Sequence, residues 1–392
     1  MRVGIDIRKA DPPGPGQQRY LWRLGEWLAT TGHETHFVTV RTQPSDVSLP
    51  EAARLHRYHG FSRRRLRDAV NALSLDALLL NPERSRRYRG VPANVLRAGY
   101  GTEHYSQKLR SFRSPVERTL RGIWRSMPWT VAEARWERAF YEGTTPPPHV
   151  IAQSRYMRRQ ILDSYAVPEE RVHVIHNPVD TDEFRPEARL DLREDARKRW
   201  SIDEGAFCLL FLGHNFRLKG LWQLLAVLGS DDLRSRDIHL LVAGSGTGAG
   251  QLRKARRLIQ RHGLEGRVTL AGAVRSSLEA LAASDALIHL SWHDSFGFAP
   301  LEGMACGLPV ILTPYAGAAE LVETGTSGLV VDPDDEDDIA EAIRSLLDPE
   351  VRVRMGGAAA AEGARHDEPS NFLRVLGVIE HAVRDRDGPV LW

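Results

Sequence analysis

The sequence is poor in cysteine and in long apolar runs. Its 392 residues include only Cys208 and Cys306, each inside an apolar stretch, which excludes a disulfide-rich scaffold and fits a reducing cytosol. No run of about eighteen apolar residues occurs, and the first residues, MRVGIDIRKA, have no signal-peptide pattern. We therefore expect a globular cytoplasmic protein that is at most peripheral, on the inner face of a membrane.

The sequence has little net charge, but that charge is unevenly distributed. The formal net charge is +2. Residues 1–180 hold 29 of the 53 Lys and Arg and 18 of the 51 Asp and Glu, a balance of +11, and the remainder has a balance of −9. A basic first half indicates an anionic partner, which can be a nucleic acid, an anionic membrane surface or a phosphorylated substrate.

Motifs for metal ions and nucleic acids are also missing. The acidic run DPDDEDD, residues 332–338, precedes IAEAIRSLL and is typical of a solvated loop and a helix N-terminus rather than of a metal site. No RNA-binding or DNA-binding motif accompanies the basic residues. We expect no metal, no cofactor and no nucleic-acid partner.

What the sequence does contain is an alternation of short apolar runs and helical stretches. Strands are predicted at residues 3–7, 34–40, 76–80, 149–154 and 172–177, and again at 208–213, 238–244, 267–272, 286–291 and 308–313. Helical segments between such strands predict an α/β fold with parallel sheets covered on both faces. The polar stretch that precedes residue 208 places a linker near residues 180–205.

Two carboxylates, Asp294 and Glu302, flank a glycine turn in WHDSFGFAPLEGMACGLPV, which follows a predicted strand. The turn precedes a helix expected to begin near Pro300, and amides at a helix N-terminus can bind phosphate oxygens. The amides in question are those of Phe296, Gly297 and Phe298. Glu302, in the first turn, can accept two hydrogen bonds from a vicinal diol such as a ribose. An ordinary N-terminal helix acid is the alternative.

Two more loops that follow predicted strands have residues suited to phosphate groups. In FLGHNFRLKG, Arg217 and Lys219 stand at the strand's carboxyl end, where open α/β sheets bind ligands, and a diphosphate suits such a pair. After the first strand, Gly14 and Gly16 would let a ligand pass close to the backbone. A solvated basic loop and a plain connecting loop are the respective alternatives.

The stretch VAGSGTGAG, residues 242–250, nearly satisfies the dinucleotide fingerprint and would indicate an NAD enzyme. A dinucleotide site has an acid after the next strand, whereas here that strand is followed by Ala273 and Arg275. The glycine run is therefore a weak indication of NAD.

Two features of the first half suggest contacts, one with a hydroxyl group of a substrate and one with a membrane surface. Glu103 and His104 follow a predicted strand and could polarise an acceptor hydroxyl, with a structural histidine as the alternative. Residues 108–140 are rich in Arg and contain three tryptophans, the composition of a helix that lies on an anionic bilayer. An Arg-rich solvated helix is the alternative there.

Together these stretches resemble the family-four retaining glycosyltransferases of GT-B fold, over nearly the whole chain. The family motif is an acid, seven residues and Glu, with Phe-Gly after the first acid, and it matches Asp294 to Glu302, with Asp where the family usually has Glu. HNPVDTDEFRP, LVAGSG, LEGRVTLAG and GAAELVETGTSGLVVDPDD match further family positions. GQQRYLWRLGEWLATTGHE, WERAFYEG and GHNFRLKG are similar to the lipopolysaccharide core glucosyltransferase (WaaG) type.

The resemblance implies two Rossmann-like domains with a cleft between them. Residues 1–180 would form the N-terminal acceptor-binding domain and residues 181–370 the C-terminal nucleotide-sugar-binding domain. Residues 371–392 would cross back to the N-terminal domain.

The resemblance also implies roles for the candidate residues. Glu302 would hold the nucleotide ribose, and Lys219 and Arg217 the diphosphate. The amides of residues 296–298 would bind the donor sugar and its phosphate, beside the Asp294 carboxylate. Glu103 and His104 would contact the acceptor hydroxyl, and Gly14 and Gly16 would face the diphosphate. The turn that contains Arg275 would lie beside the base.

We therefore predict a metal-independent retaining hexosyltransferase that moves glucose from UDP-glucose to a hydroxyl of a glycolipid or lipopolysaccharide core acceptor. UDP-GlcNAc or GDP-mannose is the alternative donor. A nucleotide-sugar epimerase, a non-catalytic sugar-nucleotide binder and an NAD enzyme are the readings from other classes. An anionic membrane surface, contacted through residues 108–140, is a further expected partner.

Overall fold

The computed structural model describes residues 1–7, 16–39, 49–58, 61–80, 91, 93–98, 119, 128–144, 146–274 and 276–385. The described residues fall into two compact units. The first is drawn from Met1–Tyr105, Arg121–Ile175 and Pro369–Trp392, and the second from Ser106–Leu120 and His176–Glu368. The acceptor and donor roles given above to the two domains, and the cleft between them, stay predictions.

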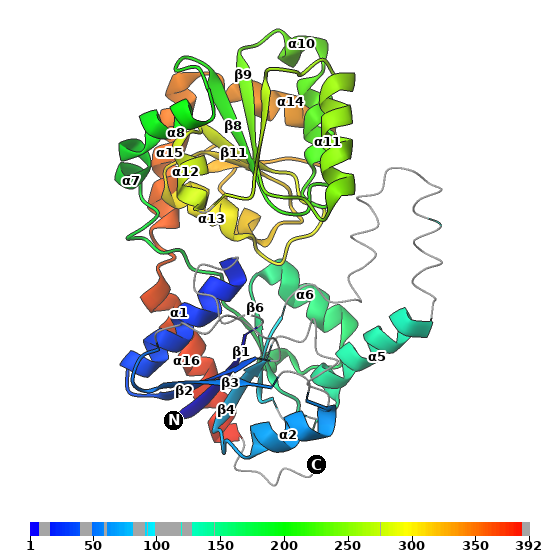
Figure 1. Cartoon of the computed structure of the whole chain (residues 1–392), viewed down its shortest axis with the longest axis vertical. Helices are drawn as coiled ribbons and strands as arrows, with labels where there is room; N and C mark the ends of the chain where they lie inside the picture. Colours follow the sequence, from blue (N-terminus) through cyan, green and yellow to red (C-terminus); the bar gives the residue numbers. More distant parts are fainter. Residues whose placement is uncertain are drawn as a thin grey trace. The chain divides into compact units, whose positions relative to one another are not determined.

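The first unit is built on a parallel sheet of seven strands in the order β3-β2-β1-β4-β5-β6-β7 (Figure 1). Its strands are β1 (Arg2–Asp6), β2 (Glu34–Thr39), β3 (Ala53–Arg57), β4 (Ala77–Leu80), β5 (Val95–Arg97), β6 (His149–Ala152) and β7 (Val172–Val174). The central strands are apolar and buried on both faces, as expected of a parallel sheet covered by helices.

Helices cover both faces of this first sheet. They are α1 (Gly16–Thr30), α2 (Arg63–Asn71), α5 (Pro128–Glu142), α6 (Arg155–Ser164), the 3-10 turn η2 (Glu169–Arg171) and α16 (Glu368–Arg384). One core joins α2, α5 and α6 to the sheet, and the stacked rings of Tyr141 and Tyr165 lie in it. On the other face, Trp22 of α1 stacks on Phe37 of β2, with ring centroids 4.7 Å apart.

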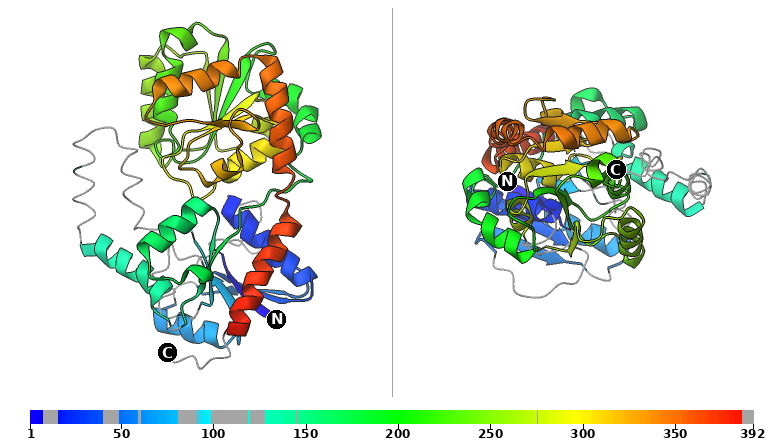
Figure 2. Two further views of the ribbon diagram at one scale, coloured as in Figure 1. Left: turned by 180° about the vertical axis from the view of Figure 1, so that it is seen from behind. Right: turned by 90° about the horizontal axis from the view of Figure 1, so that it is seen from above.

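Helix α16 belongs to the first unit although it is the last described helix of the chain. It lies beside α1 (Figures 1 and 2), where the buried Tyr20 hydroxyl donates to Asn371 Oδ1 at 3.0 Å. The rings of Tyr20 and Phe372 are in contact at 5.9 Å, and Val375 and Ile379 are buried. The chain thus returns to the first unit after completing the second.

The second unit contains a parallel sheet of six strands in the order β10-β9-β8-β11-β12-β13. Its strands are β8 (Phe207–Leu212), β9 (Ile238–Ala243), β10 (Val268–Gly272), β11 (Ala286–His289), β12 (Val310–Leu312) and β13 (Gly328–Val330). Two hydrophobic cores, one on each face, enclose β8 and β11. These two strands form the centre of the sheet.

The helices of the second unit lie over both faces of its sheet. They are α7 (Pro186–Asp191), α8 (Arg193–Arg199), α9 (Leu221–Leu228), α10 (Asp231–Arg234), α11 (Ala249–Arg261), α12 (Ser277–Ala282), α13 (Phe298–Ala305), η3 (Gly317–Leu321), α14 (Glu336–Ser345) and α15 (Pro349–Gly363). Helix α14 begins where the acidic run predicted it, because the Asp335 side chain caps the amides of Asp337 and Asp338.

Residues 186–199, inside the predicted linker, form α7 and α8 and pack on the second unit. The buried Arg197 guanidinium donates to the backbone oxygens of Ala283 and Ala206 and pairs with Asp285. Arg189 donates to the Cys306 carbonyl at 2.8 Å. The charges of this stretch therefore hold helices in place.

The ten strands predicted with bounds are all present, and β5 is the strand expected before Glu103. Two short edge strands, β3 and β13, were not predicted from the sequence. The polar ARLHR of β3 lacks an apolar run, and β13 has three residues. Both lie at the edge of a sheet, where one side has no partner strand and the apolar signal is weakest. Within the described part of the chain, no helix combines the length and the apolar character that crossing a bilayer requires.

Candidate functional site

The candidate site lies where the strand order of the second sheet reverses. From β8 the chain proceeds outward to β9 and β10, and then returns to place β11 on the other side of β8. The loops that follow β8 and β11 therefore leave the carboxyl edge of the sheet side by side. In open α/β sheets this switch point is where ligands bind.

Backbone contacts fasten these two loops to each other. The Trp292 amide donates to the Leu218 carbonyl at 2.9 Å. Gly220, with φ +83°, caps α9, and a Cβ there would clash with the Leu290 carbonyl oxygen. Glycine is required at this position because both the left-handed conformation and the close approach exclude a side chain.

Lys219, Asp294 and His289 meet at this edge. The Lys219 ammonium is ion-paired with Asp294 Oδ2, and His289 Nε2 lies 3.0 Å from the same oxygen. Asp294 is 5% exposed and His289 3% exposed. The carboxylate is thus held by two donors, one on the loop after β8 and one at the end of β11.

The electrostatics of the cluster keep Asp294 ionised and His289 neutral. Burial by itself raises the pKa of Asp294, but the Lys219 charge and the His289 hydrogen bond outweigh it and hold the pKa well below its usual range. Burial, reinforced by the Lys219 charge, lowers the pKa of His289. A neutral His289 donates Nε2–H to Asp294.

The loop after Asp294 is fixed by backbone hydrogen bonds and ends in helix α13. The Asp294 carbonyl accepts from the Gly317 amide at 3.1 Å, and the Phe296 carbonyl accepts from the Ala318 amide at 2.9 Å. Gly297, with φ +97°, precedes the first helical residue, Phe298. The amides at this helix start are therefore rigidly positioned next to the Asp294 carboxylate.

Glu302 is buried, but it lies in the second turn of α13 and not in the first turn. The prediction of a helix starting near Pro300 was two residues late, because Gly297 takes a left-handed conformation and lets the helix begin at Phe298. The exposed fraction of Glu302 is 6%. An ordinary N-terminal helix acid, which was the alternative, would lie in the first turn. The buried Glu302 carboxylate in the second turn does not fit that alternative.

The glycine run after β9 has a structural explanation of its own. Gly244 has φ +135°, and a Cβ there would clash with the Gly213 carbonyl oxygen of the loop after β8. Its amide donates to the Gly272 carbonyl at 2.6 Å. Packing of three neighbouring loops thus accounts for Gly244 without a dinucleotide.

The structure brings only part of the predicted site residues together. Lys219 and Asp294 are in contact, and Phe296, Gly297, Phe298 and Glu302 follow on one loop and one helix. Arg217 is partly buried on the Lys219 loop, and Gly16 begins α1 of the first unit. Gly14, Glu103, His104 and Arg275 lie outside the described residues, as does most of 108–140.

Sequence reasoning missed His289. It is the last residue of β11, in the apolar run ALIHLS, where it was counted as part of a strand. A histidine at the carboxyl end of a central strand, five positions before a candidate carboxylate, was the available signal.

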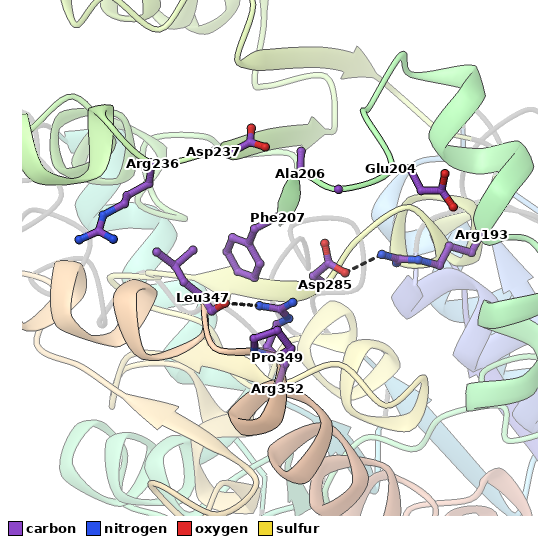
Figure 3. A pocket seen from close by; sticks show the side chains of 11 residues that line it. Arg193, Glu204, Ala206, Phe207, Arg236, Asp237, Asp285, Leu347, Pro349 and Arg352 are labelled. Carbon is purple, nitrogen blue, oxygen red and sulfur yellow. Dashed lines mark hydrogen bonds and ion pairs between the residues drawn. The ribbon is translucent and has the colours of Figure 1, made fainter.

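A cavity of about 340 Å³ lies at the opposite, amino edge of the second sheet (Figure 3). Phe207, the first residue of β8, and Asp285, which precedes β11, line it together with Arg193 and Arg352. The Asp285 carboxylate is occupied by Arg193 and by the Cys208 amide. This cavity is therefore separate from the Lys219–Asp294 cluster and is lined by groups that hold helices to the sheet.

Comparison with known families identifies both halves of the chain. The family described as "Glycosyl transferases group 1" matches residues 193–362, and the family described as "Glycosyltransferase Family 4" matches residues 15–183. Both segments thus match glycosyltransferase families. The matched residues of the group 1 family include the whole Lys219–Asp294–His289 cluster and Glu302.

Curated relatives of these glycosyltransferase segments include a D-inositol 3-phosphate glycosyltransferase of Geodermatophilus obscurus. It is 33% identical over 206 residues, which are 50% of this chain and 45% of the relative. The chain spans about half the length of the curated relatives it matches.

Solved glycosyltransferase structures share the fold over nearly the full chain. WaaG, a glycosyltransferase involved in lipopolysaccharide biosynthesis, superimposes with a TM-score of 0.76 at 20% identity, covering 96% of this chain and 99% of WaaG. Alr3699/HepE of Anabaena, solved with UDP-glucose, gives a TM-score of 0.73 at 17% identity, covering 97% and 100%. At such identities the likeness shows the fold, and the predicted α/β class with two Rossmann-like domains is confirmed.

Proposed function

We propose that the chain is a retaining, metal-independent hexosyltransferase that uses a nucleotide sugar. The Lys219–Asp294–His289 cluster at the switch point of the second sheet carries the proposal, because it joins a fixed cation to a buried carboxylate beside the amides of α13. The matches of both segments to glycosyltransferase families support the reaction type.

In the proposed reaction the bond between the sugar C1 and the diphosphate oxygen breaks, and the electron pair leaves with the nucleoside diphosphate. The Lys219 ammonium and the amides at the start of α13 stabilise that leaving charge, which is the role a metal ion would otherwise have. The sugar becomes oxocarbenium-like, and the acceptor hydroxyl attacks C1 from the face that the diphosphate leaves. The acceptor proton passes to the departing diphosphate, and the product keeps the donor's anomeric configuration.

Asp294 acts in this proposal through its fixed position as well as its charge. Lys219 and His289 fix the carboxylate, which in this proposal accepts a hydrogen bond from a hydroxyl of the donor sugar. The shorter side chain, relative to the family's usual Glu, is compensated if the sugar is held closer to the loop. We therefore assign Asp294 to the donor sugar and Glu302 to the ribose diol.

UDP-glucose is the donor we propose, with UDP-GlcNAc and GDP-mannose as the alternatives. Support comes from the buried Glu302, which suits a ribose, and from a structural neighbour whose solved complex contains UDP-glucose. The narrower likeness to the WaaG type favours the same sugar.

For the acceptor we propose an anionic hydroxyl compound, with a glycolipid or lipopolysaccharide core as the first choice. The balance of +11 over residues 1–180 supports a negatively charged acceptor and an anionic membrane surface as a partner. A phosphorylated cyclitol is the second candidate, because the curated relatives are named D-inositol 3-phosphate glycosyltransferases.

The test is a panel of nucleotide sugars scored for donor hydrolysis and for the shift in thermal unfolding. Glu302→Gln removes the ribose acceptor with little change in volume, and Glu341→Gln, on exposed α14 surface, is the matched control. We expect UDP-glucose to stabilise and be hydrolysed by the wild type and by Glu341→Gln, and Glu302→Gln to lose both effects. The proposal is wrong if no nucleotide sugar is bound or hydrolysed.

The finer claims have separate readouts. Added Mg²⁺ or Mn²⁺ should leave the rate unchanged, and NMR of the product should show the donor's anomeric configuration. Sedimentation with anionic and with neutral vesicles tests the membrane partner, and turnover with a phosphorylated cyclitol in place of a glycolipid decides the acceptor.

A further inference from the structure

Three histidines from distant parts of the sequence come together in the first unit. His149 begins β6, His173 lies in β7, and His381 lies in the last turn of α16. One ring nitrogen of each lies within 4.8 Å of the other two. No spacing motif indicates this cluster, because its members are brought together only by strand pairing and by the return of α16.

The strand register explains why two of the rings meet. Ile151 of β6 pairs with His173 of β7, so the two side chains project from the same face of the sheet. His149 is two residues before Ile151 and therefore projects from that face as well. Helix α16 supplies the third ring, with His149 and His381 ring centroids 4.7 Å apart.

A carboxylate fixes the orientation of the buried member. His149 Nε2 lies 3.1 Å from Asp385 Oδ2, and His149 Nδ1 lies 2.9 Å from His173 Nε2. Since an ionised carboxylate only accepts, the proton of His149 is on Nε2 and the Nδ1 lone pair faces the cluster. A histidine whose second nitrogen donates to a carboxylate is the usual arrangement around protein-bound zinc.

We infer that His149, His173 and His381 form a site for one divalent transition-metal ion of the zinc type, with Asp385 as the positioning residue for His149. Imidazole nitrogens suit Zn²⁺, Ni²⁺ and Cu²⁺, and three of them leave a fourth position for water. His381 is half exposed, so an ion and its water have a path from solvent.

The distances fit an ion after small ring rotations. Zn–N bonds of about 2.0–2.1 Å in a tetrahedron place two ligand nitrogens roughly 3.3 Å apart. Here one pair of nitrogens is 2.9 Å apart, somewhat closer than that value, and all three lie within 4.8 Å of one another. Arg171, a cation close to the cluster, is paired with Asp385 at 2.9 Å, and this carboxylate offsets the repulsion between Arg171 and the ion.

A second histidine pair in the same sheet provides an internal comparison. His36 of β2 and His56 of β3 are stacked, with Nδ1 and Nε2 2.9 Å apart, the same separation as in the His149–His173 pair. Among the described residues it has no third ligand group close enough to complete a site. The pair shows what a hydrogen-bonded contact without a metal looks like, and His56→Gln is the matched control.

The site would be structural, since it joins α16 to β6 and β7 within one unit. An ion that binds the folded state and not the unfolded chain shifts the folding equilibrium by mass action. The inference goes beyond the proposed sugar transfer and does not depend on it, because all of its readouts are independent of activity.

The experiment uses the full chain without an affinity tag, stripped with a chelator and then dialysed against ZnCl₂. We expect one zinc ion per chain in the wild type and in His56→Gln, and none retained in His381→Gln, whose half-exposed position makes misfolding a minor concern. Asp385→Asn should bind zinc about 10–100-fold more weakly. Co²⁺ in place of zinc should give the visible absorption of a tetrahedral site in the same variants.

Thermal unfolding provides the second measurement. Zinc should raise the unfolding temperature of the wild type and of His56→Gln and leave that of His381→Gln unchanged. The inference is overturned if the wild type takes up no stoichiometric zinc. It is also overturned if His381→Gln binds as much zinc as His56→Gln does, or if Co²⁺ shows only the octahedral spectrum of loosely bound ions.

Discussion

Asp294 keeps its negative charge in a buried position because Lys219, on the loop after β8, supplies a cation and His289, at the end of β11, supplies a neutral hydrogen-bond donor. Burying an ion pair is costly, and removing one partner leaves the other charge uncompensated. The cost falls at the site where we propose that a charged ligand binds. Lys219 and Asp294 therefore depend on each other for stability as well as for the proposed function.

We predict that Lys219→Met lowers the free energy of unfolding by about 3–5 kcal/mol, because it leaves the Asp294 carboxylate buried without a cation. Adding Asp294→Asn to that variant should recover most of the loss. Chemical denaturation measures both effects, and Lys198→Met, at a 69% exposed side chain, is the control expected to change little. A loss as small as the control's would mean that the pair is not buried as described.

The His36–His56 pair makes the stability of the first unit pH-dependent. Burial lowers the pKa of both rings, Glu34 partly opposes this at His36, and the nearby charges of Arg2 and Arg54 add to it. Folded pKa values below the ordinary 6.5 mean that the unfolded chain takes up protons first as the pH falls. The contribution of the two neutral rings to the free energy of unfolding is therefore complete above pH 6.5 and is lost as the pH falls below 6.5.

We therefore expect His56→Gln to lose less stability than the wild type when the pH falls from about 7.5 to about 5. The comparison with the wild type is needed because other buried histidines, such as His239 and His289, also have lowered pKa values. Equilibrium unfolding at a series of pH values gives the two slopes. Equal slopes for the variant and the wild type would show that His56 does not contribute to the pH dependence of stability.

At the scale of residues, the sequence predicted that Lys219 and Asp294 each follow a strand at one edge of the sheet, and the structure brings the two side chains into contact. Glu302 lies one helical turn later than predicted, and the roles of all three residues stay predictions. The sequence did not predict the contact of His289 with Asp294, because that contact depends on how the loop after β11 folds back toward the strand. It was also not sufficient for the His149 cluster, whose members are more than 200 positions apart along the chain from first to last, 149 to 381.

At the scale of elements, the buried central strands were predicted, whereas two of the four edge strands, β3 and β13, were not. The apolar runs of β8 and β11 are enclosed on both faces, so their sequence leaves one interpretation. The exact start of α13 depended on the conformation of Gly297, which composition does not determine. Turns and helix starts were thus harder to predict than the strands they connect.

The glycine loop after β9 provides a prediction at this scale. Gly244→Ala should destabilise the second unit strongly, by about 3 kcal/mol or more, because it combines a strained φ with a backbone clash against Gly213. Gly248→Ala has a comparable φ of +96° but open space around it, so its cost should be about 1 kcal/mol. Equal losses, measured by denaturant unfolding, would show that strain alone matters and that the loops are not in contact.

At the scale of the whole molecule, the two units have separate cores and need not unfold together. All of the described residues that we assign to the nucleotide and sugar, except Gly16, belong to the second unit. We therefore predict that UDP-glucose at about 100 times its dissociation constant stabilises the second unit by about 2.7 kcal/mol and shifts its calorimetric transition upward.

The transition of the first unit should move less. Assignment of the transitions uses Gly244→Ala, which should lower that of the second unit, and Asn371→Ala, which should lower that of the first by removing the acceptor of the Tyr20 hydroxyl. An upward shift confined to the first unit would place the donor elsewhere.

The return of α16 to the first unit determines when that unit can be completed on the ribosome. Domains usually fold as they emerge, N-terminal first. Here the strands of the first sheet are synthesised before residue 176, yet the helix that covers Tyr20 follows the entire second unit. The apolar surface around Tyr20 therefore stays exposed in the nascent chain, where chaperones can bind it, until α16 has left the exit tunnel.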